Sequence, residues 1–256
     1  MAPTTRANSG RGAAARPLSP AEIERFHRDG FLGIPDFTTP ADVLQVRQIV
    51  LDLYARFHRL PPRHVLDLGE VGRHAGPQQI PEINWALQLA PELKQTRTFA
   101  RCAAVAEQLI GCPMGHTGYD HAIIKPPHNA CATPWHQDRV FAGDAAPLVS
   151  IHFWIPTHDV SIEMGCMQFI PGSHRGPLLP HRRKDLRAHA KEAEGVDTSQ
   201  AVACPLPIGG ATVHHSRTLH YTGPNMTDAP RIAWSLEFAP RLRERMSWRS
   251  LLRFRG

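Results

Sequence analysis

The sequence predicts a mainly β domain, either a sandwich or a barrel, that is preceded by helices. Two observations support this fold class. Up to residue 111, apolar residues recur at helical spacing, whereas beyond it short apolar runs alternate with turns rich in proline and glycine. Many short strands separated by such turns are typical of antiparallel sandwiches and barrels. The 256 residues, 42% of them hydrophobic, can bury one sizeable core.

Three helices are predicted in the first part of the chain from the signals at their ends. The first begins at Ser19, an N-cap followed by a proline and a capping-box glutamate, and ends at Gly30. The second begins at Thr39, which is again followed by a proline. The third runs from about Pro91 to Ile110, and the glycine that follows is its stop signal.

The strands are predicted from the short apolar runs. The clearest strand begins at Arg231, because apolar residues alternate with polar or small ones as far as Phe238. Residues 60–80, rich in proline, glycine and histidine, predict a long loop, and the charged residues 180–200 predict a surface helix or a lid. The predicted strands cover residues 118–125, 149–155, 166–170, 210–214 and 231–238.

The net charge of +6 is concentrated at the ends of the chain. Residues 1–20 contain three arginines and no acid, and residues 241–256 contain six arginines and one glutamate, so the residues between them carry a net charge of −2. A nucleic-acid-binding protein usually carries its basic patch on the folded body, so nucleic acid is not expected as a partner. We expect a disordered arm over 1–18, a single domain over 19–240 and a basic tail over 241–256.

The sequence carries no signal for a membrane or for an oxidising compartment. It contains no run of 18 apolar residues, so no membrane span is expected. Its first residues lack the apolar stretch of a secretory signal. The five cysteines are scattered and include no Cys-x-x-Cys pair, which is typical of free thiols in a reducing compartment. The expected location is the cytoplasm.

A candidate metal site begins with His136 and Asp138. In an extended segment, residues two apart point to the same face, so an imidazole and a carboxylate would converge. These are two of the three ligands of the two-histidine-one-carboxylate triad that binds Fe(II) and leaves positions open. Because about one such pair is expected by chance among 16 histidines, a second, distant histidine is required. The candidates are His174, His214, His215 and His220.

His220 has the most informative surroundings of these four. It lies eleven residues before Arg231, across a Gly-Pro-Asn turn, and a hairpin there would bring the arginine alongside the histidine. A guanidinium at that distance could hold a carboxylate through two hydrogen bonds, which suits a chelating 2-oxo acid. His214 and His215 are expected to be strand residues, one inward and one outward, and His174 is expected to stabilise a turn.

The order of these motifs resembles the phytanoyl-CoA dioxygenase family of Fe(II)/2-oxoglutarate-dependent oxygenases. The matching segments are 29–37, 124–127 (Ile-Lys-Pro-Pro), 135–138 (Trp-His-Gln-Asp), 165–174, and 216–225 with Arg231 after it. The resemblance covers about residues 20–240. It implies a double-stranded β-helix, a jelly-roll or cupin-like fold, with the N-terminal helices packed on one sheet. This agrees with the order of helices and strands read from the sequence.

The resemblance also implies roles for individual residues. The iron ligands would be His136, Asp138 and His220. Arg231 would bind the far carboxylate of 2-oxoglutarate, and further contacts with this cosubstrate would come from Thr222, His121 and Asn84. The side chains that could line the substrate pocket are Lys125, Arg139, Trp154, Gln168 and Arg217.

The function implied by the resemblance is the oxidation of a small molecule. The enzyme would use Fe(II), 2-oxoglutarate and O2, release succinate and CO2, and hydroxylate an unactivated C–H bond. Asp138 occupies the position that related halogenases leave free for chloride, so halogenation is not expected.

Other functions stay open at this point. The same metal centre could catalyse desaturation, cyclisation or epimerisation in a biosynthetic pathway. The domain could instead be a cupin-like binding protein without turnover. A zinc hydrolase would fit the ligand types but would leave Arg231 without a role. The substrate class stays open among acyl-CoA thioesters, amino acids, alkaloids, terpenoids and phosphonates.

Overall fold

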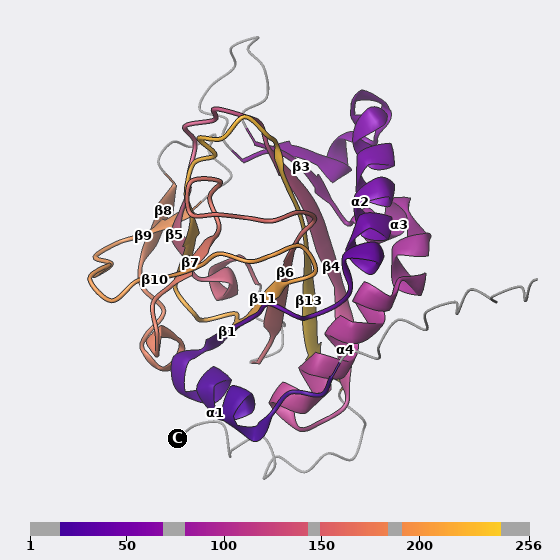
Figure 1. Cartoon of the computed structure of the whole chain (residues 1–256). Helices are drawn as coiled ribbons and strands as arrows, with labels where there is room; N and C mark the ends of the chain where they lie inside the picture. The colour runs from indigo at the N-terminus through magenta and orange to yellow at the C-terminus, as the bar shows by residue number, and fades with distance from the viewer. Residues whose placement is uncertain (1–15, 69–79, 143–148, 184–190, 242–256) are drawn as a thin grey trace, which may run out of the picture.

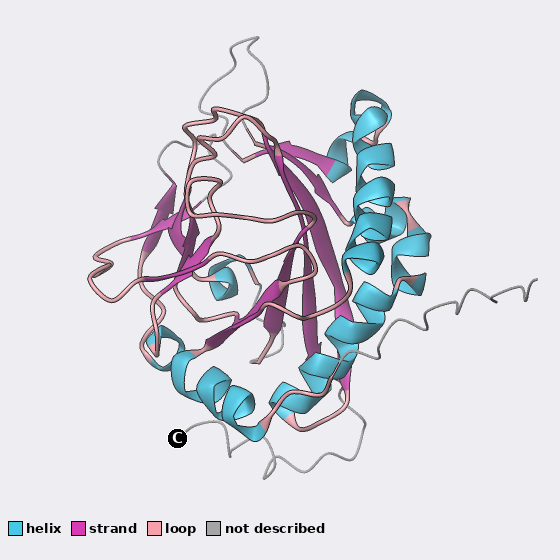
Figure 2. Cartoon of the chain, in the orientation of Figure 1, coloured by secondary structure: helices cyan, strands magenta, loops and turns pink. Residues whose placement is uncertain are grey.

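Two antiparallel sheets face each other, and helices cover the outer side of the larger sheet (Figure 1). The computed structural model describes residues 16–68, 80–142, 149–183 and 191–241. Figure 2 shows the long helices gathered on one side of the strands. Two facing sheets with helices on one of them are the jelly-roll architecture that the family resemblance implies, so the expected fold class is confirmed.

The strands form two sheets and one separate pair. Their bounds are β1 Phe31–Ile34, β2 Val65–Asp67, β3 Pro81–Asn84, β4 Met114–Lys125, β5 Thr133–His136, β6 Ile151–Pro156, β7 Met167–Phe169, β8 His181–Arg183, β9 Lys191–Ala193, β10 Val202–Cys204, β11 Ala211–His215, β12 His220–Thr222 and β13 Arg231–Pro240. The larger sheet has the order β1-β11-β6-β13-β4-β3-β2, the smaller one β10-β7-β12-β5, and β8 pairs with β9.

The helices begin and end largely where the sequence signals predict. Their bounds are α1 Pro20–Asp29, α2 Pro40–Ala55, α3 Ala86–Leu89 and α4 Arg97–Ile110, with short 3-10 helices at η1 Phe57–Arg59, η2 Pro62–His64, η3 Pro91–Gln95, η4 Asp138–Phe141 and η5 Ser173–Arg175. In α1, the Ser19 hydroxyl accepts a hydrogen bond from the Glu22 amide, and the Glu22 carboxylate accepts one from the Ser19 amide. Gly30 ends this helix with φ +82°, a conformation that suits glycine.

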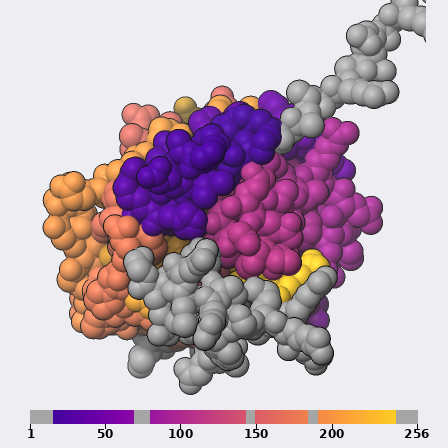
Figure 3. Space-filling view, turned by 90° about the horizontal axis from the view of Figure 1, so that it is seen from below, coloured from indigo at the N-terminus to yellow at the C-terminus, as the bar shows by residue number. Residues whose placement is uncertain are grey.

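The third predicted helix is divided in two by Thr96. Its extended backbone interrupts the helical path, and its hydroxyl accepts a hydrogen bond from the Phe99 amide. The segment from Pro91 is therefore the 3-10 helix η3, and α4 begins only at Arg97. Figure 3 shows α1 lying along α4 on the lower face of the molecule, where the Gln108 side chain accepts a hydrogen bond from the Leu18 amide.

Alternate residues of β13 serve two different surroundings. Trp234, Leu236 and Phe238 belong to the apolar core between the larger sheet and the helices. Arg231 and Glu237 point the other way and line a cavity between the two sheets. This alternation follows from the strand period of two, so each long strand contributes one face to stability and the other to the cavity.

Several details of the sequence prediction are wrong. The expected hairpin between His220 and Arg231 does not form, because β12 pairs with β5 and β7 whereas β13 pairs with β4 and β6 of the other sheet. The described parts of segment 180–200 form the strands β8 and β9 and contain no helix. The described parts of segment 60–80 contain η2 and β2. Short strands such as β1 and β12 lie outside the predicted runs.

Most of the two predicted end segments lies outside the described residues. These are residues 1–15 of the predicted arm and residues 242–256 of the predicted basic tail. Arg16 to Leu18, which the sequence assigns to the arm, contact the folded body. The Arg16 guanidinium pairs with Glu22 and Asp36, and the Leu18 side chain is buried.

Candidate metal centre

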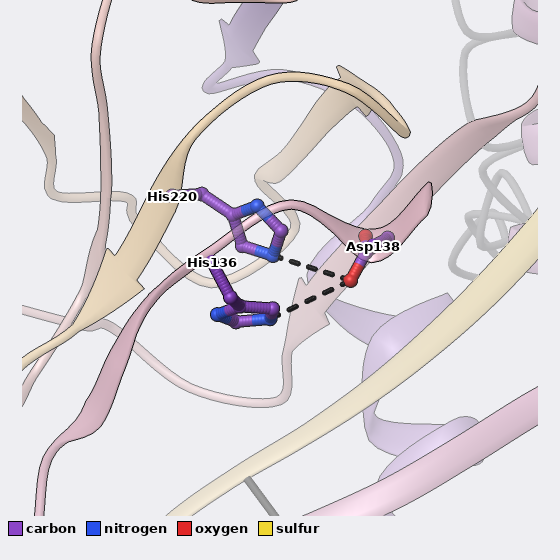
Figure 4. Close-up of side chains that lie close together, drawn as sticks. All are labelled: His136, Asp138 and His220. Carbon is purple, nitrogen blue, oxygen red and sulfur yellow. Dashed lines mark ion pairs between the residues drawn. The ribbon is translucent and has the colours of Figure 1, made fainter. Parts of the chain in front are cut away.

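His136, Asp138 and His220 converge in the cavity between the two sheets (Figure 4). His136 ends β5 and His220 begins β12, and the two are register partners in the smaller sheet. Asp138 follows two residues later, at the start of η4. The Nε2 atoms of both histidines lie 3.5 Å from Oδ1 of Asp138. The sheet thus supplies two imidazoles side by side, and the turn after β5 supplies the carboxylate.

The hydrogen bonds of the two rings prepare their Nε2 atoms to bind a cation. Nδ1 of His136 lies 2.7 Å from the Pro134 carbonyl, and Nδ1 of His220 lies 2.9 Å from the Thr218 carbonyl. A carbonyl oxygen only accepts, so each Nδ1 carries the proton and each Nε2 keeps a lone pair. Two lone pairs and a carboxylate oxygen that point at one position repel one another unless a cation lies between them.

The surroundings keep these groups in the protonation states that a metal requires. Burial, followed by the neighbouring His220, lowers the pKa of His136. Burial raises the pKa of Asp138, but the nearby His152 and His220 outweigh it and hold this pKa well below its ordinary value. A neutral imidazole and an ionised carboxylate are the forms that bind a metal, so the residues present fit an Fe(II) ion.

Two further histidines contact the other oxygen of Asp138. Nε2 of His214 lies 2.9 Å from Oδ2, and Nδ1 of His152 lies 3.2 Å from it. His214 is the inward residue of its pair in β11 and His215 the half-buried one beside it. Burial and the neighbouring His220 lower the pKa of His214 to about 3, so its ring is neutral. His152 was not among the residues predicted from the sequence. Its position two residues before Trp154 on a predicted strand was the signal available.

Two buried basic side chains lie at another part of the site. Arg231 and Lys125 are register partners on β13 and β4, and both side chains are almost completely buried. Lys125 Nζ donates to the Thr222 hydroxyl at 2.9 Å and to the Gly223 carbonyl at 2.6 Å. Arg231 donates from Nη1 to the Gly165 carbonyl at 2.9 Å and lies over the Trp154 ring, 5.4 Å from its centroid.

Neither basic side chain has an anionic partner among the described residues. Among the described residues, no carboxylate forms an ion pair with Arg231 or Lys125, and Nε of Arg231 is buried without a hydrogen bond. Burial lowers the pKa of Arg231 to about 10, and burial together with Arg231 lowers that of Lys125 to about 6. Arg231 therefore stays charged near pH 7, whereas the Lys125 amine is mostly neutral there. A buried charge is normally paired, so the surroundings of Arg231 fit the carboxylate of a ligand.

His121 and Asn84 lie on the same wall of the cavity, on neighbouring strands. His121 donates from Nδ1 to Oε1 of Glu82 at 2.6 Å, and Asn84 accepts a hydrogen bond from the Tyr119 hydroxyl at 3.1 Å. Burial lowers the pKa of His121, but the Glu82 carboxylate outweighs it and the net pKa is raised. Oε2 of Glu82 is buried without a partner among the described residues.

The cavity that joins these groups has a volume of about 650 Å³, within the range of small-molecule sites. Besides Asp138 and the four histidines around it, its walls include Arg231, Thr222, His121, Asn84, Trp154, Glu82, Glu237, Leu66, Leu68 and Phe141. The structure therefore brings every predicted metal and cosubstrate residue into one space.

The candidate substrate residues are divided between the cavity and other sites. Trp154 lies on the cavity wall, whereas Lys125, Arg139, Gln168 and Arg217 are not among the residues that line it. Gln168 lies between Met167 and Phe169 of β7 and so faces the opposite side of that strand. The Arg217 guanidinium donates to the carbonyls of His174 and Gly176, which fixes the loop around η5.

Known proteins share this architecture. The crystal structure of EvdO2 from Micromonospora carbonacea var. aurantiaca, complexed with 2-oxoglutarate, matches with a TM-score of 0.74 and 32% identity, over 92% of this chain and 99% of that chain. The non-heme alpha ketoglutarate dependent epimerase SnoN from nogalamycin biosynthesis matches with a TM-score of 0.66 and 26% identity, over 86% and 82%. L-proline trans-4-hydroxylase from Streptomyces griseoviridis is 28% identical over 243 residues, 86% of this chain and 85% of the relative.

The fold and these relatives define the class of protein. The chain is a non-haem Fe(II)/2-oxoglutarate-dependent oxygenase. Within this class it belongs to the phytanoyl-CoA dioxygenase family, because the sequence model of that family, Phytanoyl-CoA dioxygenase (PhyH), matches residues 26–233. The family, the enzyme class and the requirement for Fe(II), 2-oxoglutarate and O2 that the sequence predicts are confirmed. Among the described residues, no helix is long and apolar enough to cross a membrane.

Proposed function

We propose that the enzyme hydroxylates an unactivated C–H bond of a small molecule, with His136, Asp138 and His220 as the iron ligands and Arg231 as the anchor of the cosubstrate. One observation carries the proposal. Three groups that need a cation line the same cavity as Arg231, a buried cation that has no anionic partner among the described residues. A ferrous ion and a dicarboxylate that chelates it satisfy both requirements together.

The residues of the chain would hold and orient the reactants. When bound, the ferrous ion supplies the redox chemistry that couples the oxidative decarboxylation of 2-oxoglutarate to oxidation of the substrate. Arg231, which lines the cavity, would donate from its guanidinium to the far carboxylate, a charge-assisted hydrogen bond. Lys125 holds the Thr222 hydroxyl oxygen at 2.9 Å, which directs the hydroxyl proton away from Lys125 and makes it available to the same carboxylate. His121 and Asn84 would contact the other end of the cosubstrate from the wall.

The wall of the cavity also bears on the class of substrate. Glu82 has one carboxylate oxygen bonded to His121 and the other without a partner among the described residues, and Glu237 accepts a hydrogen bond from the Thr117 hydroxyl at 2.8 Å. Glu82 and Glu237 both line the cavity, and a carboxylate on a cavity wall favours hydrogen-bond donors and cations. The part of the substrate that reaches this wall should therefore carry a hydroxyl or an ammonium group. Release of succinate with amino acids or glycosides, but not with acyl-CoA thioesters, would test this.

The outcome at the substrate carbon is proposed to be hydroxylation. Asp138 supports this proposal because it fills the position that chloride would need, and a hydroxylase is among the relatives. An epimerase of known structure is also a relative, so the product must decide between the two. A product that gains one oxygen atom is expected. A product of unchanged mass and inverted stereochemistry would replace this proposal by epimerisation, and a loss of two hydrogens would replace it by desaturation.

The metal and cosubstrate residues can be tested before the substrate is known. Anaerobic addition of Fe(II) and 2-oxoglutarate to the protein should give a weak visible charge-transfer band. We expect Asp138→Ala to abolish the band by loss of the metal, and Arg231→Ala to shift its formation to much higher 2-oxoglutarate concentrations. Arg28→Ala is the control, because this exposed arginine on α1 pairs with its neighbour Asp29 and is not among the residues that line the cavity. A band unchanged in both test variants would refute the assignment.

The proposed location of the enzyme is the cytoplasm, with a small molecule as its partner and no nucleic acid. All five cysteines are free thiols, which supports a reducing compartment.

A further inference from the structure

Four imidazoles surround the Asp138 carboxylate, and they divide between its two oxygens. Oδ1 faces His136 and His220, both at 3.5 Å. Oδ2 faces His214 at 2.9 Å and His152 at 3.2 Å. The proposed metal ligands account for the first pair only, so the second pair needs a reason of its own.

The hydrogen bonds of His214 differ in kind from those of the proposed ligands. His136 and His220 each direct Nδ1 to a backbone carbonyl and leave Nε2 free for a metal. His214 directs Nε2 to Oδ2, whereas its Nδ1 is buried and has no hydrogen-bond partner among the described residues. The proton must lie on Nε2, because on Nδ1 it would leave a buried N–H unsatisfied and a lone pair against the carboxylate. His214 is thus a hydrogen-bond donor to Asp138.

His152 supports the same oxygen from the next strand. Its Nδ1 lies 3.2 Å from Oδ2 of Asp138, and its Nε2 lies 3.4 Å from Oε1 of Glu237. Its ring stacks against that of His214, with centroids 5.5 Å apart. His214 and His152 are register partners, as are His152 and Glu237. Three neighbouring strands of the larger sheet therefore present these side chains in one row.

Asp138 needs this row because its own backbone gives it little support. His136 and His220 are held by the strand pairing of β5 and β12, whereas Asp138 begins the 3-10 helix η4, outside any strand. A carboxylate on such a turn can rotate and offer either oxygen, or both, to a metal. Ligating groups are commonly oriented by hydrogen bonds to their far side.

We propose that His214, backed by His152, is the positioning residue of the metal centre, which ties down Oδ2 so that Asp138 offers Oδ1 alone. The inference rests on the proposed assignment of Asp138 as a ligand. Asp138, His152 and His214 also lie close enough to hold an ion among themselves. However, the 2.9 Å contact has the geometry of a hydrogen bond, and each nitrogen of His152 faces a different carboxylate, that of Asp138 or that of Glu237. These features indicate that His214 and His152 orient the Asp138 carboxylate and do not form a second metal site.

The test is an anaerobic titration with Co(II), read by its ligand-field absorption in the absence of 2-oxoglutarate. His214→Phe keeps a ring in the stack but removes the N–H. We expect its Kd for Co(II) to rise by about 10- to 100-fold, the usual effect of losing such a partner, and the absorption bands to move as Oδ2 becomes free to bind. His214→Gln, which keeps a donor, should recover most of the affinity. His215→Phe is the matched control, since this next residue of β11 contacts neither Asp138 nor the cavity.

The outcomes separate the inference from the proposed function. A folded His214→Phe protein with wild-type affinity and spectrum would overturn the inference, as would two Co(II) ions per wild-type chain and one per variant. Thermal unfolding without metal identifies a variant that has lost its fold, and His214→Leu then replaces it. If Asp138→Ala and His136→Ala bind Co(II) as the wild type does, the proposed ligand set itself fails. If they lose Co(II) and His214→Phe does not, only the positioning role fails.

Discussion

The two faces of the larger sheet place opposite demands on neighbouring residues of the same strand. On the outer face of β13, Trp234 and Phe238 pack in the apolar core beneath the helices. On the inner face, Arg231 and Glu237 keep charges within a cavity. The outer residues stabilise the fold through burial, whereas Arg231 on the inner face is a buried cation without an anionic partner among the described residues. Residues that stabilise the fold and residues that line the cavity therefore alternate along the strand. Substitutions on the outer face should change stability, and substitutions on the inner face should change ligand binding.

The largest effect is expected from Trp234→Ala on the outer face. The Trp234 side chain is completely buried, and its Nε1 donates to Asp120 at 2.9 Å. Its removal should lower the free energy of unfolding by about 3–5 kcal/mol, as measured by denaturant unfolding of the apo protein. Ser235→Ala, the neighbour on the inner face, should cost no more than about 1 kcal/mol. Equal losses in the two variants would contradict the division between the faces.

The second prediction concerns Arg231→Leu on the inner face. Loss of the charge-assisted hydrogen bonds should raise the Kd for 2-oxoglutarate about 100-fold, which corresponds to about 2.7 kcal/mol. The apo protein should not become less stable, because the variant removes a buried cation that has no anionic partner among the described residues. Isothermal titration and denaturant unfolding measure the two quantities. An Arg231→Leu protein that loses stability but binds 2-oxoglutarate normally would assign the residue to the scaffold.

The third prediction uses pH to examine Asp120, a buried carboxylate on the outer face. Burial raises the pKa of Asp120, which accepts hydrogen bonds from Trp234 and from the Leu87 amide. The folded state then binds more protons than the unfolded state between the ordinary and the raised pKa, so the contribution of Asp120 to stability falls as pH rises through that window. The slope is at most about 1.4 kcal/mol per pH unit. Asp120→Asn should remove it, and a difference between the two proteins that does not vary with pH would contradict this.

The smallest effect is expected at the first helix, outside both faces. Ser19→Ala removes the hydroxyl that accepts from the Glu22 amide, and the free energy of unfolding should fall by about 1 kcal/mol. Ser19→Asp, which keeps an acceptor, should remain close to the wild type. Thermal unfolding measures both variants, and binding of 2-oxoglutarate should be unchanged in each.

Local signals predicted much of the scaffold. The capping box at Ser19, the stop at Gly30 and the alternation along β13 depend on residues within one turn or one strand, so the sequence contains the information needed to recognise them. The start of α4 was misplaced, because Pro91 also begins a helical turn and only the backbone of Thr96 separates it from the helix.

Long-range pairing limited the prediction of the site. The chemical types of the candidate ligands and their motif order pointed to His136, Asp138 and His220, but no local pattern indicated that His152 would meet Asp138. That contact arises because β6 lies beside β11 in the larger sheet, and the choice of strand neighbours depends on residues far apart in the chain.

By itself, the sequence determined the ends of the first helices, the face of each long strand that would be apolar, and the kinds of groups available for a metal and a carboxylate. Each of these depends on the chemistry of neighbouring residues. Only the tertiary structure decided that β12 and β13 lie in opposite sheets, and that Lys125 joins Thr222 and lies beside Arg231. It also decided that two histidines hold the second oxygen of Asp138. Backbone hydrogen bonds are alike in every strand, so side-chain packing over the whole domain has to select the partners.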